Sequence, residues 1–170
     1  DQFYGYELSI DGIIHEIETG QMDMASLAQG QGGYSHPVVR LVDALLSDGV
    51  HKFASDIHFE PEGQFLRIRY RIDGVLRQVR VLHGRYWSAM LVRLKLVAGM
   101  NIAESRAPQD GRVSLSIAGR NVDFRAAVQP TIHGENFVLR VLDAKRGIVD
   151  YDKLGLTDDQ YHLLNLMLAR

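Results

Sequence analysis

The chain has 170 residues, enough for one domain with a substantial hydrophobic core and some additional segments. Its hydrophobic fraction of 46% and charged fraction of 24% are typical of a soluble protein, and no apolar run approaches the roughly 18 residues that span a bilayer. Cysteine is absent, which excludes disulfides and cysteine-ligated metals and is consistent with a cytoplasmic protein.

The net charge of −2 conceals an uneven distribution along the chain. Residues 1–62 hold 2 basic and 11 acidic side chains, a net charge of −9, whereas residues 64–146 hold 15 basic and 6 acidic ones, a net charge of +9. A basic central region favours an anionic ligand or an acidic partner surface. No nucleic-acid partner is predicted, because the basic residues are not interleaved with aromatic ones as in single-strand-binding proteins.

The first 35 residues contain one predicted helix and one predicted linker. A short amphipathic helix over 7–19 follows from four isoleucines at helical spacing: Ile10, Ile13, Ile14 and Ile17. Residues 20–35 are rich in Gly, Gln and Ser, which predicts a flexible linker. We expect residues 1–35 to be the end of an upstream domain and its linker.

A second helix is predicted to start sharply after this linker. Ser35 is a suitable N-cap, and Pro37 fits the first turn, where its missing N–H costs nothing. The pair Asp48-Gly49 is expected to close the helix.

The first predicted strand, over 55–60, ends at Pro61 and carries Asp56, His58 and Glu60 on one face. One histidine and two carboxylates are able to ligate a divalent ion. No partner cluster lies at a suitable spacing, however, so we predict a hydrogen-bonded structural face and no metal.

Two further strands and a helix follow. Residues 64–72 alternate apolar residues with arginines, and Asp73-Gly74 predicts a hairpin turn into a strand over 75–82. A helix over about 84–99 places Trp87 and Met90 in the core, and residues 100–112 are expected to form a loop.

The next three predicted strands, 112–119, 121–128 and 136–142, each carry one arginine on the more polar side: Arg112, Arg125 and Arg140. These arginines are either solvated strand positions or a set of guanidinium groups that grips a phosphate bidentately. Pro130 is expected to end the second of these strands. The third is apolar on both faces apart from its arginine, which predicts a central position in the sheet.

A linker is expected over 143–155, followed by an amphipathic helix over 157–169. We expect the apolar side chains of this helix to pack on a segment beyond residue 170. No phosphate-binding P-loop motif G-x-x-x-x-G-K-[ST] occurs, and no motif of a metalloprotease or serine hydrolase is present. We therefore predict no catalytic residue within these 170 residues.

Several motifs in fixed order resemble one protein family over residues 36–170. They are SHPVVRLVDALL, ASDIHFEP, RIRYRIDGVL, RLKLVAGMNIAESRAPQDGR and GENFVLRVLD. Together they resemble the domain that precedes the P-loop domain in the hexameric ATPases of type II secretion and type IV pilus assembly, including the mannose-sensitive type of pilus.

The resemblance implies an α/β (α+β) fold: a PAS-like domain over 36–146, with a mostly antiparallel sheet backed by helices. Residues 147–170 are then the linker and first helix of a RecA-like ATPase domain with Walker motifs, and ATP and Mg²⁺ serve the full-length parent. The implied partners are this RecA-like domain, neighbouring subunits of a homohexamer and an inner-membrane platform protein. The implied location is cytoplasmic, at the periphery of the inner membrane.

In the family, arginines of this domain reach the nucleotide phosphates at the interface with the motor domain. The matching positions are Arg112 (PQDGR), Arg125 (DFR) and Arg140 (VLR), with Arg71 (RYRIDG) as a further candidate. Relatives often have paired basic residues before PQDGR where this chain has Ser105-Arg106, so no role is assigned to Ser105. The alternative is a PAS-like module that binds a ligand or partner and takes no part in hydrolysis.

Overall fold

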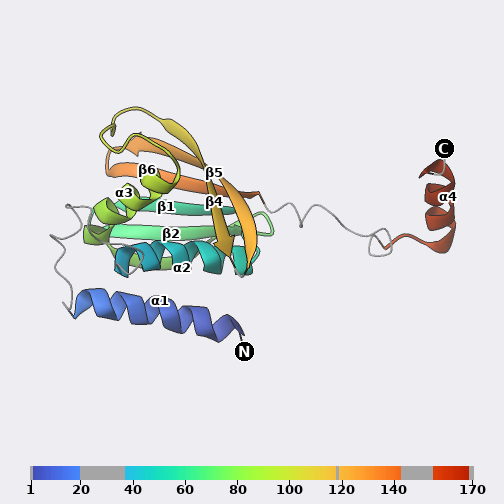
Figure 1. Ribbon diagram of the computed structural model, residues 1–170, viewed down its shortest axis with the longest axis horizontal. Helices are drawn as coiled ribbons and strands as arrows, with labels where there is room; N and C mark the ends of the chain where they lie inside the picture. Colours follow the sequence, from blue (N-terminus) through green and yellow to red (C-terminus); the bar gives the residue numbers. More distant parts are fainter. Residues whose placement is uncertain (1, 20–36, 118, 143–154, 169–170) are drawn as a thin grey trace.

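The computed structural model describes residues 2–19, 37–117, 119–142 and 155–168, which form an α+β fold as predicted (Figure 1). The predicted linkers 20–35 and 143–155 lie, but for Gly155, outside the described residues. None of the described helices is long and apolar enough to cross a membrane. The elements are α1 (Gln2–Glu18), α2 (Pro37–His51), β1 (Asp56–Glu62), β2 (Phe65–Ile72), β3 (Val75–His83), α3 (Trp87–Val97), β4 (Gln109–Ile117), β5 (Arg120–Thr131), β6 (Gly134–Leu142) and α4 (Asp158–Leu168).

The six strands form one antiparallel sheet in the order β3-β2-β1-β6-β5-β4. Two meanders, β1-β2-β3 and β4-β5-β6, are joined where β1 pairs with β6. The central position predicted for β6 is confirmed, and it explains why that strand is apolar on both faces. Strand β4 forms one edge of the sheet and β3 the other.

Helices α2 and α3 pack on one face of the sheet and enclose the core (Figure 1). The hydroxyl group of Tyr70 on β2 donates a hydrogen bond of 2.8 Å to the carbonyl oxygen of Leu45 on α2. Trp87 at the start of α3 stacks on Phe59 of β1, with ring centroids 6.1 Å apart. Trp87 therefore belongs to the core, as predicted.

Helix α1 packs along α2 (Figure 1). Ile10 and Ile13 are buried in the same core, and the carboxylate of Asp11 lies 2.6 Å from the guanidinium group of Arg80 on β3. The predicted helix is confirmed, and it begins five residues earlier than expected. The division of the chain into three parts at residues 35 and 146 stays a prediction.

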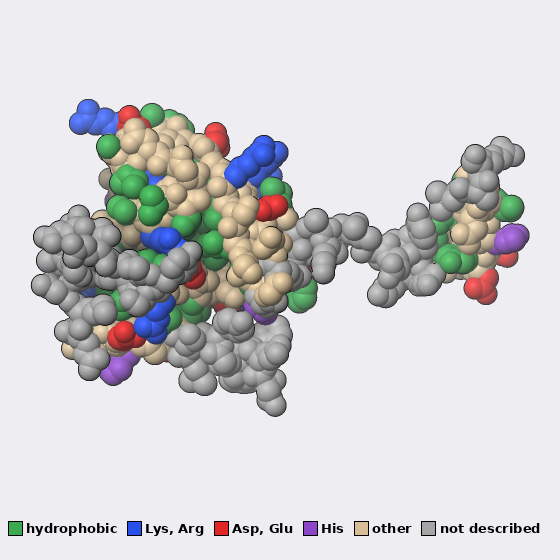
Figure 2. Space-filling view, viewed as in Figure 1, with side chains coloured by type: hydrophobic (Ala, Val, Ile, Leu, Met, Phe, Trp, Pro, Cys, Tyr) green, Lys and Arg blue, Asp and Glu red, His purple; other side chains and the backbone are tan. Residues whose placement is uncertain are grey.

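Helix α4 carries acidic residues in its first turn and exposes Leu163, Leu166 and Met167 (Figure 2). This arrangement agrees with the amphipathic helix expected from the sequence. The expectation that its apolar face packs on a further domain stays a prediction.

Several predicted element ends were wrong for identifiable reasons. Helix α2 does not close at Asp48-Gly49 but continues to His51, and Gly49 instead allows close packing: a Cβ atom there would lie 2.5 Å from Cδ1 of Ile57. Strands β1 and β5 run through Pro61 and Pro130. Pro61 lies beyond the part of β1 that pairs with β6, so its missing N–H removes no hydrogen bond on that side.

Candidate anion-binding site

Four arginines form a row across the sheet. Cross-strand pairing places Arg112 of β4 opposite Arg125 of β5, Arg125 opposite Arg140 of β6, Arg140 opposite Asp56 of β1, and Asp56 opposite Arg71 of β2. Residues directly opposite each other on neighbouring strands point to the same face. We call Arg112, Arg125, Arg140 and Arg71 the arginine row.

The alternation of each strand puts this row on the face opposite to α2 and α3. The neighbours Val113, Phe124, Leu139 and Tyr70 all belong to the core that those helices cover. The arginines therefore point away from the core, and Arg112, Arg125 and Arg140 are exposed. The sequence predicted one outward arginine on each of β4, β5 and β6 and three on β2, and the structure brings Arg71 of β2 into one line with the other three candidates.

At the β1 end of the row, Asp56 holds two of the arginines. Its carboxylate lies 3.0 Å from Nε of Arg140 and 3.2 Å from Nε of Arg71, and it accepts a hydrogen bond of 2.9 Å from the hydroxyl of Ser55. Burial alone would raise the pKa of Asp56. The hydrogen bonds from Ser55 and Arg140 and the positive charges of Arg140 and Arg71 outweigh that effect, so the pKa lies below its ordinary value.

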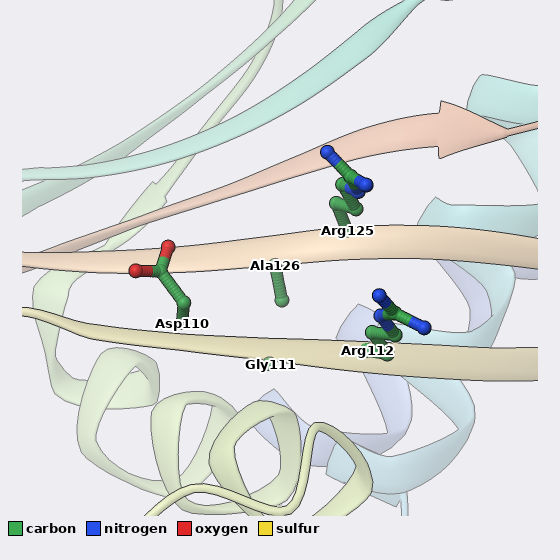
Figure 3. A pocket seen from close by; sticks show the side chains of 5 residues that line it. All are labelled: Asp110, Gly111, Arg112, Arg125 and Ala126. Carbon is green, nitrogen blue, oxygen red and sulfur yellow. The ribbon is translucent and has the colours of Figure 1, made fainter.

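At the β4 edge, Arg112 and Arg125 have no such partner: neither guanidinium group makes a hydrogen bond or ion pair with another residue in the described part of the chain. With Asp110, Gly111 and Ala126 they line a cavity of about 450 Å³ (Figure 3). Figure 3 shows the side chains of Asp110, Arg112 and Arg125 rising from β4 and β5 on the same side.

The charges in this part of the row are unfavourable for the fold alone. Like charges directly opposite on neighbouring strands destabilise a sheet, and Arg125 has an arginine opposite it on both sides. A bound anion would remove this repulsion, and a guanidinium pair matches the geometry of a phosphate oxygen pair. The arrangement is therefore chemically suited to bind a phosphate group.

The strand that carries Arg112 is held firmly from the side of α3. A Cβ atom at Gly111 would clash with the carbonyl oxygen of Ala98, so β4 passes too close to the end of α3 for any other residue. The side-chain amide of Gln109 accepts a hydrogen bond from the backbone N–H of Asn101 (2.8 Å) and donates one to its carbonyl (3.0 Å).

A buried ion pair supports the same loop. Nζ of Lys95 on α3 lies 2.6 Å from the carboxylate of Glu135 on β6 and donates a hydrogen bond of 2.6 Å to the carbonyl oxygen of Glu104. The Lys95 and Glu135 side chains are only 2% and 8% exposed. Glu104 in turn accepts hydrogen bonds from the backbone N–H groups of Arg106 and Ala107, which lower the pKa of its carboxyl group.

Asp56, His58 and Glu60 lie on one face of β1, but both carboxylates are paired with arginines, and His58 lies beside Glu60. Besides the Asp56 pairs, the carboxylate of Glu60 lies 2.6 Å from Arg69 and 3.6 Å from Nδ1 of His58. Burial lowers the pKa of His58 although Glu60 and Asp56 oppose that shift. No group of three His, Asp or Glu residues in the described ranges is arranged to hold a metal ion.

Sequence reasoning missed three contributors to this region. Asp110 fell within a predicted loop, whereas β4 starts at Gln109 and places Asp110 two residues before Arg112 on the same face. The motif PQDGR itself carried this signal, because residues two apart in a strand share a face. Lys95 was missed because a charged residue on an apolar helix is normally assigned to solvent, and Glu135 because it was assigned to the connection before the last strand, whereas β6 begins at Gly134.

Comparison with known proteins places the chain in a family. The sequence model of the family described as "Type II/IV secretion system protein" matches residues 32–170. "Type II secretion system protein E" of Xanthomonas campestris pv. campestris is 39% identical over 163 residues, which are 94% of this chain and 28% of the relative. The protein of the same name from Aeromonas hydrophila is 46% identical over 134 residues, 79% of this chain and 27% of the relative.

A third relative, "Type II secretion system ATPase E" of Vibrio cholerae, is 40% identical over 134 residues, again 79% of this chain and 27% of the relative. The chain belongs to the type II/IV secretion system protein family, which confirms the resemblance seen in the motifs. It spans less than a third of the length of these relatives.

Proposed function

We propose that this chain is a regulatory and coupling domain of a secretion or pilus-assembly ATPase, and that its arginine row contacts the phosphates of a nucleotide bound by a RecA-like domain. The observation that carries the proposal is the pair Arg112 and Arg125. They lie in register on neighbouring strands, beside a cavity, and neither has an acidic partner among the described residues.

The chemistry of phosphoryl transfer explains why such residues matter. Negative charge spreads over the oxygens of the transferring phosphoryl group, and a guanidinium group fixed nearby stabilises it. The chain has no P-loop of its own, so the phosphates must be presented by another domain. Arginines that reach across a domain interface make hydrolysis depend on how the two domains are placed, which couples hydrolysis to motion.

The two ends of the row have different parts in this proposal. Arg112 and Arg125 have no ion-pair partner among the described residues, and their guanidinium groups can form bidentate hydrogen bonds with phosphate oxygens. Arg140 and Arg71 are held by Asp56 and contribute positive potential and position rather than the first contact. ATP is the substrate of the parent in this proposal and Mg²⁺ its cofactor, and the arginine row fits the phosphate end of such a ligand.

The assembly follows from the same proposal. We expect the parent to form a homohexamer in which this domain meets RecA-like domains of its own and neighbouring subunits. We also expect a cytoplasmic location at the inner membrane, through a platform protein of the secretion or pilus machine. The names of the relatives point to type II secretion, and the family also includes type IV systems.

The test is steady-state ATP hydrolysis by the full-length protein. Arg112→Ala and Arg125→Ala should each lower kcat by about a hundredfold or more, as expected for loss of a group that stabilises phosphoryl charge. Arg67→Ala is the matched control, because Arg67 lies on the same face of β2 but outside the row, paired with the exposed carboxylate of Glu62. Wild-type kcat in both row variants would remove these arginines from the mechanism.

The cavity also favours a second candidate function, a module that senses an anionic ligand by itself. Titration of the 170-residue chain with nucleotides and cyclic dinucleotides separates the two. Weak binding that is lost in Arg112→Ala supports the coupling role, whereas tight binding without any motor domain supports the sensor.

A further inference from the structure

Resting on the proposed function, the geometry points to Asp110 as a selectivity residue of the arginine site. We propose that its carboxylate makes the site favour a polyphosphate that carries Mg²⁺ over the same polyphosphate without the metal. The ligand class is a metal-complexed triphosphate, either inorganic or part of a nucleotide.

Asp110 is placed for this role by the register of β4 and β5. It lies two residues before Arg112 on β4, and its partner on β5 is Ala127, two residues after Arg125. Both arginines therefore lie on the same face as Asp110, with Cα atoms about 7 Å away: Arg112 along β4 and Arg125 diagonally across on β5. The carboxylate lines the cavity with both arginines and makes no ion pair or hydrogen bond with any residue that the structure describes (Figure 3).

A carboxylate in this place is costly for a site that binds a bare anion. It repels phosphate oxygens and offsets part of the attraction exerted by the arginines. The same carboxylate becomes favourable if the ligand brings a cation, because Mg²⁺ is commonly held by one or two carboxylates together with substrate phosphates. Two arginines and one carboxylate are thus complementary to a phosphate chain with its metal, and less so to the chain alone.

The neighbouring Asp123 provides a built-in comparison. It lies on the same face of β5, two residues before Arg125, and its partner on β4 is Ser114, two residues after Arg112. Its distance from the arginine pair thus matches that of Asp110, on the opposite side. Asp123, however, already accepts a hydrogen bond of 2.5 Å from Ser114 and does not line the cavity.

The experiment measures binding of inorganic triphosphate to the 170-residue chain by phosphorus NMR titration, with and without Mg²⁺. The chain has no P-loop, so no other triphosphate site of that kind competes. The quantity compared is the ratio of the two affinities, with metal over without metal. In Asp110→Asn this ratio should fall about three- to tenfold relative to wild type, as expected for one charge at this distance.

Asp123→Asn sets the reference. Both substitutions remove one negative charge at a similar distance, so both should raise the affinity for metal-free triphosphate and lower the ratio somewhat. The ratio should fall further in Asp110→Asn, because only this variant also loses a carboxylate beside the metal. An unchanged ratio in Asp110→Asn, or an equal fall in both variants, would overturn the role of Asp110 while leaving the arginine site intact. If wild type and Arg112→Ala bind triphosphate equally poorly, the proposed arginine site itself fails, and the inference with it.

Discussion

A substitution at Arg125 tests whether the arginine row stabilises the fold or destabilises it, as expected for a site that binds an anion. It is exposed, and it faces Arg112 on one side and Arg140 on the other. Arg125→Gln removes the charge and leaves a shorter side chain that is still unbranched at Cβ and polar. If repulsion within the row destabilises the fold, this variant of the 170-residue chain should be more stable than wild type.

The magnitude follows from the two pairs that are relieved. A cross-strand pair contributes about 0.2–1 kcal/mol, so removing two repulsive pairs should raise the free energy of unfolding by about 0.5–2 kcal/mol. For a domain of this size, that corresponds to a rise in Tm of roughly 1–8 °C. The gain should shrink at about 1 M NaCl, where the Debye length is only about 3 Å.

Arg140→Gln is the matched control on the next strand. Its guanidinium group holds the buried carboxylate of Asp56, so removing it should lower the free energy of unfolding by about 1 kcal/mol after allowing for its exposure. The measurement is urea unfolding at low and high salt. A destabilised Arg125→Gln, or a gain that does not depend on salt, would refute the view that repulsion dominates this part of the row.

Three further predictions concern the supports of the site. Gly111→Ala should destabilise the chain by about 1–3 kcal/mol in chemical denaturation, because the new Cβ atom meets backbone at the end of α3. Lys95→Met should cost about 3–5 kcal/mol, since it leaves the carboxylate of Glu135 buried without its partner. Burial lowers the pKa of His58, so the unfolded state binds its proton at a higher pH than the folded state does. Stability should therefore fall on acidification below about pH 6.5, and His58→Gln should reduce that fall.

Each of these has a control within the chain. Gly12→Ala on α1 meets no atom within 4 Å and should be neutral or stabilising, which separates a clash from a general effect of losing glycine. The double variant Lys95→Met/Glu135→Leu should be more stable than Lys95→Met alone. Equal stability of the single and double variants would show that the buried carboxylate of Glu135 does not destabilise the chain when Lys95 is absent. A pH profile that is the same in wild type and His58→Gln would contradict the argument about burial.

Much of the local structure was predictable because its causes are local. The alternation in 64–72 placed apolar residues inward and three arginines outward, and Asp73-Gly74 formed the expected hairpin turn, with both residues at positive φ. The outward arginine on each of β4, β5 and β6 followed from the same two-residue period. Helix and strand ends were less predictable, because Gly49 and Pro61 were interpreted by their usual roles and not by what packs beside them.

The assembly of the site was not predictable in this way. The row exists because Arg140 and Asp56, 84 residues apart, meet where β1 pairs with β6, and no local pattern specifies that register. The difference between the two ends of the row also depends on this pairing, because Asp56 reaches only the arginines on its two neighbouring strands, Arg140 and Arg71. The strand pattern and the likeness to a family supplied the candidate residues, but only the register shows which of them pair with Asp56.

A ligand that relieves the repulsion in the row should stabilise the folded chain, which links the two properties of the site. Anything that binds only the folded state adds RT ln(1 + [L]/Kd), about 2.7 kcal/mol at a hundredfold excess over Kd. Inorganic triphosphate should therefore raise the Tm of wild type, and raise it less in Arg125→Gln, although that variant begins from a higher Tm. When Tm is plotted against triphosphate concentration, the lines for wild type and Arg125→Gln should cross, and this crossing is the distinctive outcome. Parallel shifts in both proteins would mean that triphosphate binds elsewhere and that Arg112 and Arg125 serve some other purpose.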